Sequence, residues 1–350
     1  MSSNTAGKIT VGREIPLAVI LGCAGSKLSK NEEALFKETN PFGLILFERN
    51  CVNPDQVKAL TNEFRHVIGQ EGAPVFIDQE GGRVTRLKPP HWRHPPPTQS
   101  FVDLANLKGE EIASKAIQLN FRLIAEDLHA LGINVDCTPV LDIPIACADP
   151  IIGDRALGND LELIKKLATA ICDGLLSGRV FPVIKHIPGH GRALVDSHTD
   201  LPTVDATFEE LMETDFEAFR SFSDMPLAMT AHIIFSEIDE NNPVTLSRKV
   251  IEKVVRGYIG YDGLLISDDL SMRALSGGIK ERTWEALDAG CDLVLHCNGK
   301  MDEMISVVAG AENMTDKACE RWSHATQLLP TAGDFNVQDT LSQLNDLMVG

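Results

Sequence analysis

The sequence predicts a single (β/α)8 barrel of the TIM type with a helical extension at its C-terminal end. Two observations carry this prediction. Short apolar runs recur eight times along the chain, and polar segments with helical periodicity lie between them. The chain also has 350 residues, which is long for most single domains but ordinary for an α/β barrel.

The eight runs are apolar on both faces, as parallel strands enclosed by helices must be. In chain order they are residues 16–22, 43–47, 74–77, 133–136, 180–185, 226–231, 262–267 and 292–296.

Two of the intervening segments show the apolar face of a helix clearly. Residues 159–178 place five apolar side chains on one face, namely Ile164, Leu167, Ala168, Ile171 and Leu175. Residues 246–260 do the same with Ile251, Val254, Val255 and Tyr258. Ser247 is the expected N-cap of this second helix, and Gly260 is its expected C-terminal stop.

Nothing in the composition indicates a second domain, so residues 1–350 are expected to form one catalytic barrel domain. From about residue 316 to residue 350, helical patterns predict extra helices packed on the outside of the barrel. The proline-rich segment 87–99 predicts a long extended loop after the third strand. That loop is either a rigid connection or part of a site wall, and its Trp92 is either structural or a stacking platform for a substrate.

The net charge of −18 excludes nucleic acid as an expected partner, because such a chain repels phosphate backbones. The 8 cysteines are irregularly spaced and predict free thiols in a reducing compartment. No apolar run approaches the length of a membrane span. Residues 15–25 follow Lys8 and Arg13 and contain ILGC, which is similar to a lipoprotein cleavage box, but the count of eight strands favours a buried first strand here. The sequence therefore predicts a cytoplasmic protein.

Polar side chains follow the strands at the edge where the active site of such a barrel lies. They are Asp78 after the third run, Asp136 and Asp142 after the fourth, Lys185 and His186 at the end of the fifth, His232 after the sixth, Asp268 and Asp269 after the seventh, and His296 at the end of the eighth. Core packing does not explain so many polar groups on one rim. We therefore expect a polar site for a small molecule there.

The segment KHIPGHGRALVDSH (185–198) concentrates three histidines in a loop that its glycines and proline keep from being helical. Two interpretations compete for it, a proton-transfer loop and a metal site built from His186, His190, Asp196 and His198. The ammonium of Lys185 would repel a dication, and the spacing matches no zinc motif. We expect no metal and no cofactor.

Five motifs carry a resemblance to a known family. DQEGGRVTR (78–86), GDRALG (153–158), KHIPGHG followed by DSH (185–198), TAHIIF (230–235) and ISDDLSM (266–272) together resemble glycoside hydrolase family 3, and more closely its single-domain bacterial β-N-acetylglucosaminidases of the cell-wall recycling type. The resemblance runs from the first strand to about residue 300. The family usually has Phe where this chain has Ile187 and an aromatic residue where it has Leu157, and neither change removes a chemical group.

The resemblance implies a role for each matched residue. Asp268 would be the nucleophile, with its neighbour Asp269 as the competing carboxylate, and Asp196 with His198 would form the acid/base dyad. A histidine titrates near neutral pH, and a hydrogen-bonded aspartate fixes its tautomer. The sugar-binding groups would be Asp78, Arg86, Arg155, Lys185 and His186.

The expected function is that of a retaining exo-β-N-acetylglucosaminidase that removes terminal GlcNAc from GlcNAc-anhydro-muramyl (peptide) fragments during peptidoglycan recycling. Three alternatives stay open at this point. They are a β-N-acetylglucosaminide phosphorylase, because a histidine acid/base does not repel phosphate, then a β-glucosidase, then a sugar-binding barrel without catalysis.

Overall fold

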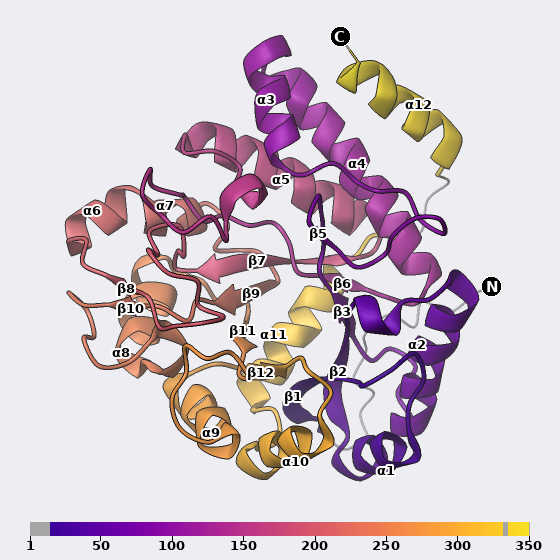
Figure 1. The fold of residues 1–350 in the computed structure, drawn as a ribbon, viewed down its shortest axis with the longest axis vertical. Coiled ribbons are helices and arrows are strands. Elements are labelled where there is room, and N and C mark those ends of the chain that lie inside the picture. Colours follow the sequence, from indigo (N-terminus) through magenta and orange to yellow (C-terminus); the bar gives the residue numbers. More distant parts are fainter. Residues whose placement is uncertain (1–14, 332–334, 350) are drawn as a thin grey trace.

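The computed structural model describes residues 15–331 and 335–349, and in these residues eight parallel strands close into a barrel (Figure 1). The strands follow one another around the barrel in the order β1, β12, β11, β9, β7, β6, β3 and β2. Their bounds are β1 Leu17–Gly22, β2 Pro41–Leu46, β3 Val75–Ile77, β6 Val135–Asp136, β7 Phe181–Ile187, β9 Leu227–Thr230, β11 Leu264–Asp269 and β12 Leu293–His296. Each strand overlaps one of the eight predicted runs, so the predicted barrel is confirmed.

The structure shows whether the segment with ILGC is a buried strand or a lipoprotein cleavage box. β1 pairs in parallel with β2 on one side and with β12 on the other, and its Val19, Ile20 and Leu21 are fully buried. Segment 17–22 is therefore part of the barrel wall, as the strand interpretation predicted. Lys8 and Arg13, which flank it in the sequence, lie outside the described residues.

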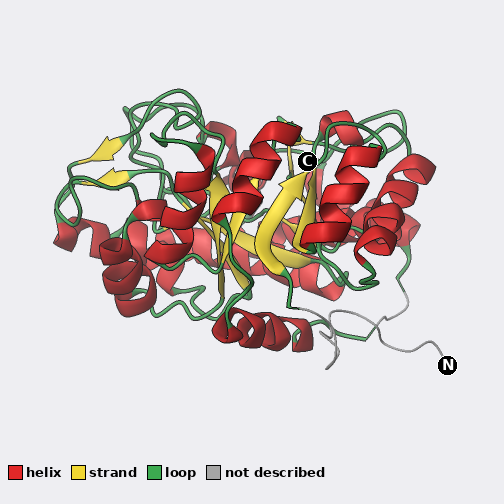
Figure 2. Ribbon diagram, turned by 90° about the horizontal axis from the view of Figure 1, so that it is seen from below, coloured by secondary structure: helices red, strands yellow, loops and turns green. Residues whose placement is uncertain are grey.

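Helices surround the strands on the outside, as Figure 2 shows in profile. The longer ones are α1 Lys30–Thr39, α2 Pro54–Ile68, α3 Gln99–Lys108, α4 Glu110–Ala130, α5 Leu161–Ser177, α9 Ile279–Ala289 and α10 Met301–Gly310. The shorter ones are η1 Glu48–Asn50, η2 Gly153–Arg155, α6 Phe208–Glu213, α7 Asp215–Arg220, η3 Val244–Leu246, α8 Arg248–Val250 and η4 Ile251–Tyr258. Among the described residues, no helix is both long enough and apolar enough to cross a lipid bilayer.

The two helices foreseen from their apolar faces form where the sequence places them. α5 begins after Asp160, whose carboxylate accepts a hydrogen bond from Leu163 N at 2.9 Å, and it buries Ile164, Leu167 and Ile171. Ser247 caps the start of α8 by accepting from Val250 N, and η4 continues α8 with π-helical turns. Gly260 follows with a φ of 74°, a left-handed conformation that costs glycine little and ends the helix.

The two helices of the C-terminal extension pack in different places. α12 (Val337–Met348) lies on the outside of the barrel against α4, as predicted. α11 (Asp316–Gln327) lies instead in the middle of the ring of strands in the view of Figure 1. Its Trp322 is 2% exposed and contacts the inward rings of Phe42 and Phe181, each with ring centroids 5.1 Å apart. α11 therefore packs on the barrel at the N-terminal end of its strands, which it closes.

A hairpin stands on the rim after β3. It consists of β4 (Gln79–Gly81) and β5 (Val84–Thr85), which pair antiparallel. The proline-rich loop backs this hairpin: Pro95 O accepts from Gly82 N at 2.9 Å, and a Cβ at Gly81 would lie 2.3 Å from Pro96 O. Only glycine permits that approach of two backbones. A second small pair, β8 (Thr203–Val204) with β10 (Ile234–Phe235), lies on the far side of the rim.

Candidate active site

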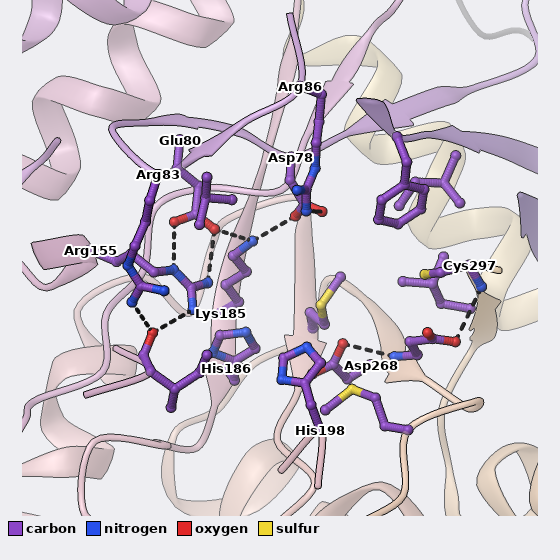
Figure 3. A pocket seen from close by; sticks show the side chains of 18 residues that line it. Asp78, Glu80, Arg83, Arg86, Arg155, Lys185, His186, His198, Asp268 and Cys297 are labelled. Carbon is purple, nitrogen blue, oxygen red and sulfur yellow. Dashed lines mark hydrogen bonds and ion pairs between the residues drawn. The ribbon is translucent and has the colours of Figure 1, made fainter. Parts of the chain in front are cut away.

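A cavity of about 270 Å³ opens at the C-terminal ends of the barrel strands. Side chains from β2, β3, β7, β11 and β12, or from the loops that follow them, line it together with the β4–β5 hairpin. In Figure 3, His198 and Asp268 lie on one side, and a row of charged side chains, Arg155, Glu80, Lys185, Asp78 and Arg86, lies along the other.

Asp268 stands near the end of β11 and lines the cavity. Its Oδ1 accepts a hydrogen bond from Asp269 N at 2.8 Å. Burial by itself would raise the pKa of this carboxyl, but the nearby His232 and His186, followed by the Asp269 amide, lower it below the usual range. Asp268 is therefore an ionised carboxylate on a rigid strand, facing an open cavity.

The carboxylate of the neighbouring Asp269 is already engaged by other groups. Its oxygens accept from Ser271 N at 3.0 Å, from Ser271 Oγ at 2.7 Å and from Cys297 N at 3.2 Å. His232 lies behind the same strand end, where its Nε2 is 3.0 Å from Asp269 O and its Nδ1 is 2.7 Å from Thr245 Oγ1. Asp269 and His232 thus hold the end of β11 in place.

Asp196 and His198 are brought together on the loop after β7. His198 Nδ1 lies 2.7 Å from Asp196 Oδ1, and the same oxygen accepts from His198 N at 2.9 Å. The slight burial of Asp196 works to raise its pKa, but these hydrogen bonds outweigh it and the pKa is lowered. The His198 side chain is 61% exposed, and it lines the same cavity as Asp268.

The opposite wall is a continuous network of ion pairs, in which Lys185 and Glu80 are buried and Asp78 and Arg86 are partly exposed. Lys185 Nζ donates to Asp78 Oδ1 at 2.9 Å and contacts Glu80 Oε1 at 2.7 Å. Arg86 donates to the other oxygen of Asp78 at 3.0 Å, and Arg155 holds both oxygens of Glu80 at 2.8 and 2.9 Å. The bidentate contact fixes the guanidinium plane as well as its distance.

These contacts shift the pKa values of the network. Burial works to raise the pKa of Glu80, but Arg155 and Lys185 outweigh it and lower that pKa to about 2. Lys185 and Arg86 lower the pKa of Asp78 in the same way, against the effect of burial. Burial would lower the pKa of Lys185, yet Asp78 and Glu80 raise it. All of these groups are therefore charged at neutral pH.

Glu80 is a site residue that reasoning from the sequence missed. It lies two positions after Asp78 on an extended segment, and side chains two apart on such a segment point the same way. That spacing was a signal for Glu80. The partner of Glu80, Arg155, comes from η2 in a separate loop, and only the folded chain brings the two together.

Asp142, which the sequence placed on the rim after the fourth strand, supports a histidine of the cavity. Its Oδ2 lies 2.7 Å from His186 Nδ1, and its Oδ1 accepts from His186 N at 3.2 Å and from His190 N at 2.6 Å. This buried carboxylate fixes the ring of His186, which lines the cavity. Burial would raise the pKa of Asp142, but the two histidines and their hydrogen bonds lower it.

Two expectations about the rim were wrong. The fully buried His296 places its Nε2 3.1 Å from Glu303 Oε2 on α10, and it is not among the described residues that line the cavity. Asp136 is also fully buried and accepts from Gln79 N at 2.8 Å, so it lies beneath the wall. Of the two alternatives for Trp92, the structure favours the structural one, because Trp92 is half-buried against the core and is not among the described residues that line the cavity.

Each of the four side chains considered as a metal ligand already has a hydrogen-bonding partner. His186 binds Asp142, His190 Nε2 lies 3.0 Å from Ser197 Oγ, and Asp196 pairs with His198. Within residues 15–331 and 335–349, no three His, Cys, Asp or Glu side chains cluster in a way that could hold a metal ion.

Comparison with known proteins identifies the family. Residues 13–324 match the model of the glycosyl hydrolase family 3 N-terminal domain. The β-hexosaminidase of Methylobacillus flagellatus is 36% identical over 296 residues, which cover 82% of this chain and 83% of that protein.

Solved structures agree with this family. NagZ from Neisseria gonorrhoeae in complex with N-trifluoroacetyl-D-glucosamine superposes with a TM-score of 0.84 at 29% identity, covering 95% of this chain and 98% of that one. The same NagZ in complex with a zinc ion superposes with a TM-score of 0.83 at 29% identity, covering 96% and 99%. The chain is therefore a glycosidase that belongs to glycosyl hydrolase family 3, among the bacterial β-hexosaminidases.

Proposed function

We propose that this glycosidase is a retaining exo-β-N-acetylglucosaminidase that removes terminal GlcNAc from GlcNAc-anhydro-muramyl (peptide) fragments of peptidoglycan. The observation that carries the proposal is the composition of one cavity. An ionised Asp268 and a dyad histidine line one side, and paired charged groups line the other. The N-trifluoroacetyl-D-glucosamine bound by the gonococcal NagZ supports a GlcNAc-type sugar.

In the first step, an Asp268 oxygen attacks the anomeric carbon while the bond from that carbon to the leaving oxygen breaks. His198 gives its Nε2 proton to the leaving oxygen. Asp196, 2.7 Å from Nδ1, keeps that nitrogen protonated, so the proton that moves is the one on Nε2. A glycosyl ester of Asp268 results.

In the second step, water attacks the anomeric carbon and the ester bond to Asp268 breaks. His198 Nε2 takes a proton from the water, which restores the dyad. Two displacements at the same carbon retain its configuration. The acid and the base are thus one histidine in two protonation states.

Asp78, Arg86, Arg155, Lys185 and His186 are the proposed sugar-binding groups. The cavity of about 270 Å³ fits the removal of one terminal sugar at a time. The lysine and arginines donate hydrogen bonds and the carboxylate accepts them, so sugar hydroxyls meet partners of both kinds. A sugar that lacks a matching hydroxyl leaves one of these buried groups without its partner, which penalises its binding.

The proposal includes two features of the whole chain. Residues 1–350 act as one catalytic domain, and the enzyme works in the cytoplasm. Free thiols at all eight cysteine positions support a reducing compartment.

Turnover of 4-nitrophenyl β-GlcNAc, measured with and without phosphate, tests the reaction. We expect release of free GlcNAc with retained configuration in both buffers and little turnover of the matching glucoside. GlcNAc 1-phosphate as the main product in phosphate buffer would replace hydrolysis by phosphorolysis. Release of GlcNAc from a GlcNAc-anhydro-muramyl peptide, compared with chitobiose, tests the substrate.

A further inference from the structure

Ser197 lies between the two residues of the dyad but points the opposite way. The Asp196 and His198 side chains are 29% and 61% exposed, whereas Ser197 is 3% exposed. The inward side chain of Ser197 therefore anchors the exposed loop that carries the dyad.

The partner of the inward serine is His190, from the same loop. His190 Nε2 lies 3.0 Å from Ser197 Oγ, and His190 N donates to Asp142 Oδ1 at 2.6 Å. His190 is 3% exposed, and its ring lies 5.6 Å from the ring of His186, centroid to centroid. Burial, with a further contribution from His186, lowers the pKa of His190 to about 4, so it is neutral at working pH. Ser197 is thereby tied to the Asp142 carboxylate that also fixes a proposed sugar-binding histidine.

A second tie runs to the other side of the site. Ser197 O accepts a hydrogen bond from Ala274 N at 3.3 Å, in the segment that follows the strand of Asp268. Ser197 is thus joined to the loop after β7 by its side chain and to the segment after β11 by its backbone. Among the described residues, the Ser197 side chain makes no other hydrogen bond.

We propose that Ser197 and His190 are positioning residues, which set the distance of the Asp196–His198 dyad from the leaving oxygen and act in proton transfer rather than in sugar binding. This inference rests on the proposed role of the dyad. The Ser197 side chain touches neither the cavity nor the dyad groups. Its effect on the reaction must therefore pass through His198.

The test uses Ser197→Ala, His198→Ala and the double variant on aryl β-GlcNAc substrates with leaving groups from phenol to 2,4-dinitrophenol. We expect Ser197→Ala to lower kcat about 10-fold for the phenyl glycoside, the size of one lost hydrogen bond, with KM nearly unchanged. The glycosylation rate of this variant with the 2,4-dinitrophenyl glycoside should stay near that of the wild-type protein. Added to His198→Ala, the serine change should cost nothing more, because both remove the same proton transfer.

The matched control is Ser247→Ala, which removes another buried serine hydroxyl, the helix cap that donates to Asp239 at 2.6 Å. It should lower the melting temperature without any dependence on the leaving group. Ser197→Cys keeps a weak donor and should fall between wild type and Ser197→Ala.

Equal losses across all leaving groups, or losses that multiply in the double variant, would overturn the role of Ser197 while leaving the dyad intact. A His198→Ala variant without leaving-group dependence would overturn both the dyad and the positioning role that rests on it.

Discussion

The two sides of the cavity are built in contrasting ways. The charged wall has a buried centre, where the side chains of Lys185 and Glu80 are each only 3% exposed, and each of its charged groups has at least one partner of opposite charge. The dyad stands on an exposed loop, and the His198 ring has one hydrogen-bonding partner among the described residues. The wall is therefore preorganised to hold a sugar, whereas the proton donor depends on how its loop is held. Five measurements test this difference.

Asp268→Ala should have the largest effect. Hydrolysis should fall at least about 10⁴-fold because no nucleophile remains, while the melting temperature changes little. A 2-fluoro glycoside should label Asp268 in the wild-type protein, as peptide mass spectrometry will report. A label on Asp269 would contradict the assignment, because the nucleophile would then be Asp269, whose carboxylate accepts hydrogen bonds from Ser271 in the structure.

His198→Ala should lower kcat/KM by about 10²–10⁴-fold for poor leaving groups, because general acid help is lost. Dinitrophenyl GlcNAc needs no proton, so its first step should survive. A burst of dinitrophenolate should precede slow turnover, since water is no longer activated. Asp196→Ala should act in the same direction. If every leaving group suffers equally, His198 positions the sugar or the loop and donates no proton.

Lys185→Met should lower the free energy of unfolding far more than a change in the dyad does. It leaves Asp78 and Glu80 facing each other without the buried ammonium, and breaking such a network costs about 3–5 kcal/mol of unfolding free energy. The exposed pair removed by Asp196→Ala should cost only about 0–1 kcal/mol. Urea unfolding of both variants measures the contrast, and similar costs would mean that the wall is no more rigid than the loop.

Asp136, beneath the wall, should make stability depend on pH. Burial raises the pKa of its carboxyl to about 8, whereas an unfolded aspartate titrates near 3.8. The folded protein thus binds an extra proton between these values, and this contribution to stability is lost as pH rises towards 8. Asp136→Asn should remove a slope of about 1 kcal/mol per pH unit or less between pH 5 and 8. Identical slopes in wild type and variant would show that Asp136 is ionised in the fold.

Removal of metal should have the smallest effect, namely none. If the loop after β7 transfers protons, dialysis against a chelator leaves kcat unchanged. The gonococcal NagZ has been solved in complex with a zinc ion, so the chelation experiment is a direct test for this chain. Activity that disappears with chelator and returns with zinc would restore the metal interpretation.

The same contrast explains what the sequence could predict. Strand positions follow from local apolar runs, and strand ends of a barrel converge, so the rim was predictable. The direction of a side chain at a strand end is not local information: His296 turns to α10 and Asp136 turns beneath the hairpin. The pairing of Glu80 with Arg155 joins two rim loops and needs the closed barrel. Likewise, the periodicity of residues 316–327 predicted a helix, but it could not predict that this helix packs against the N-terminal end of the barrel.

The position of α11 has a consequence for how the protein is made. Phe42 leaves the ribosome early, but Trp322, which it contacts edge to face, emerges only after all eight strands have been synthesised. At about 5–20 residues per second, roughly tens of seconds separate the two. During that time the rings of Phe42 and Phe181 lack the indole that covers them in the finished fold. The aromatic core at this end of the barrel can therefore be completed only after nearly the whole chain has been synthesised.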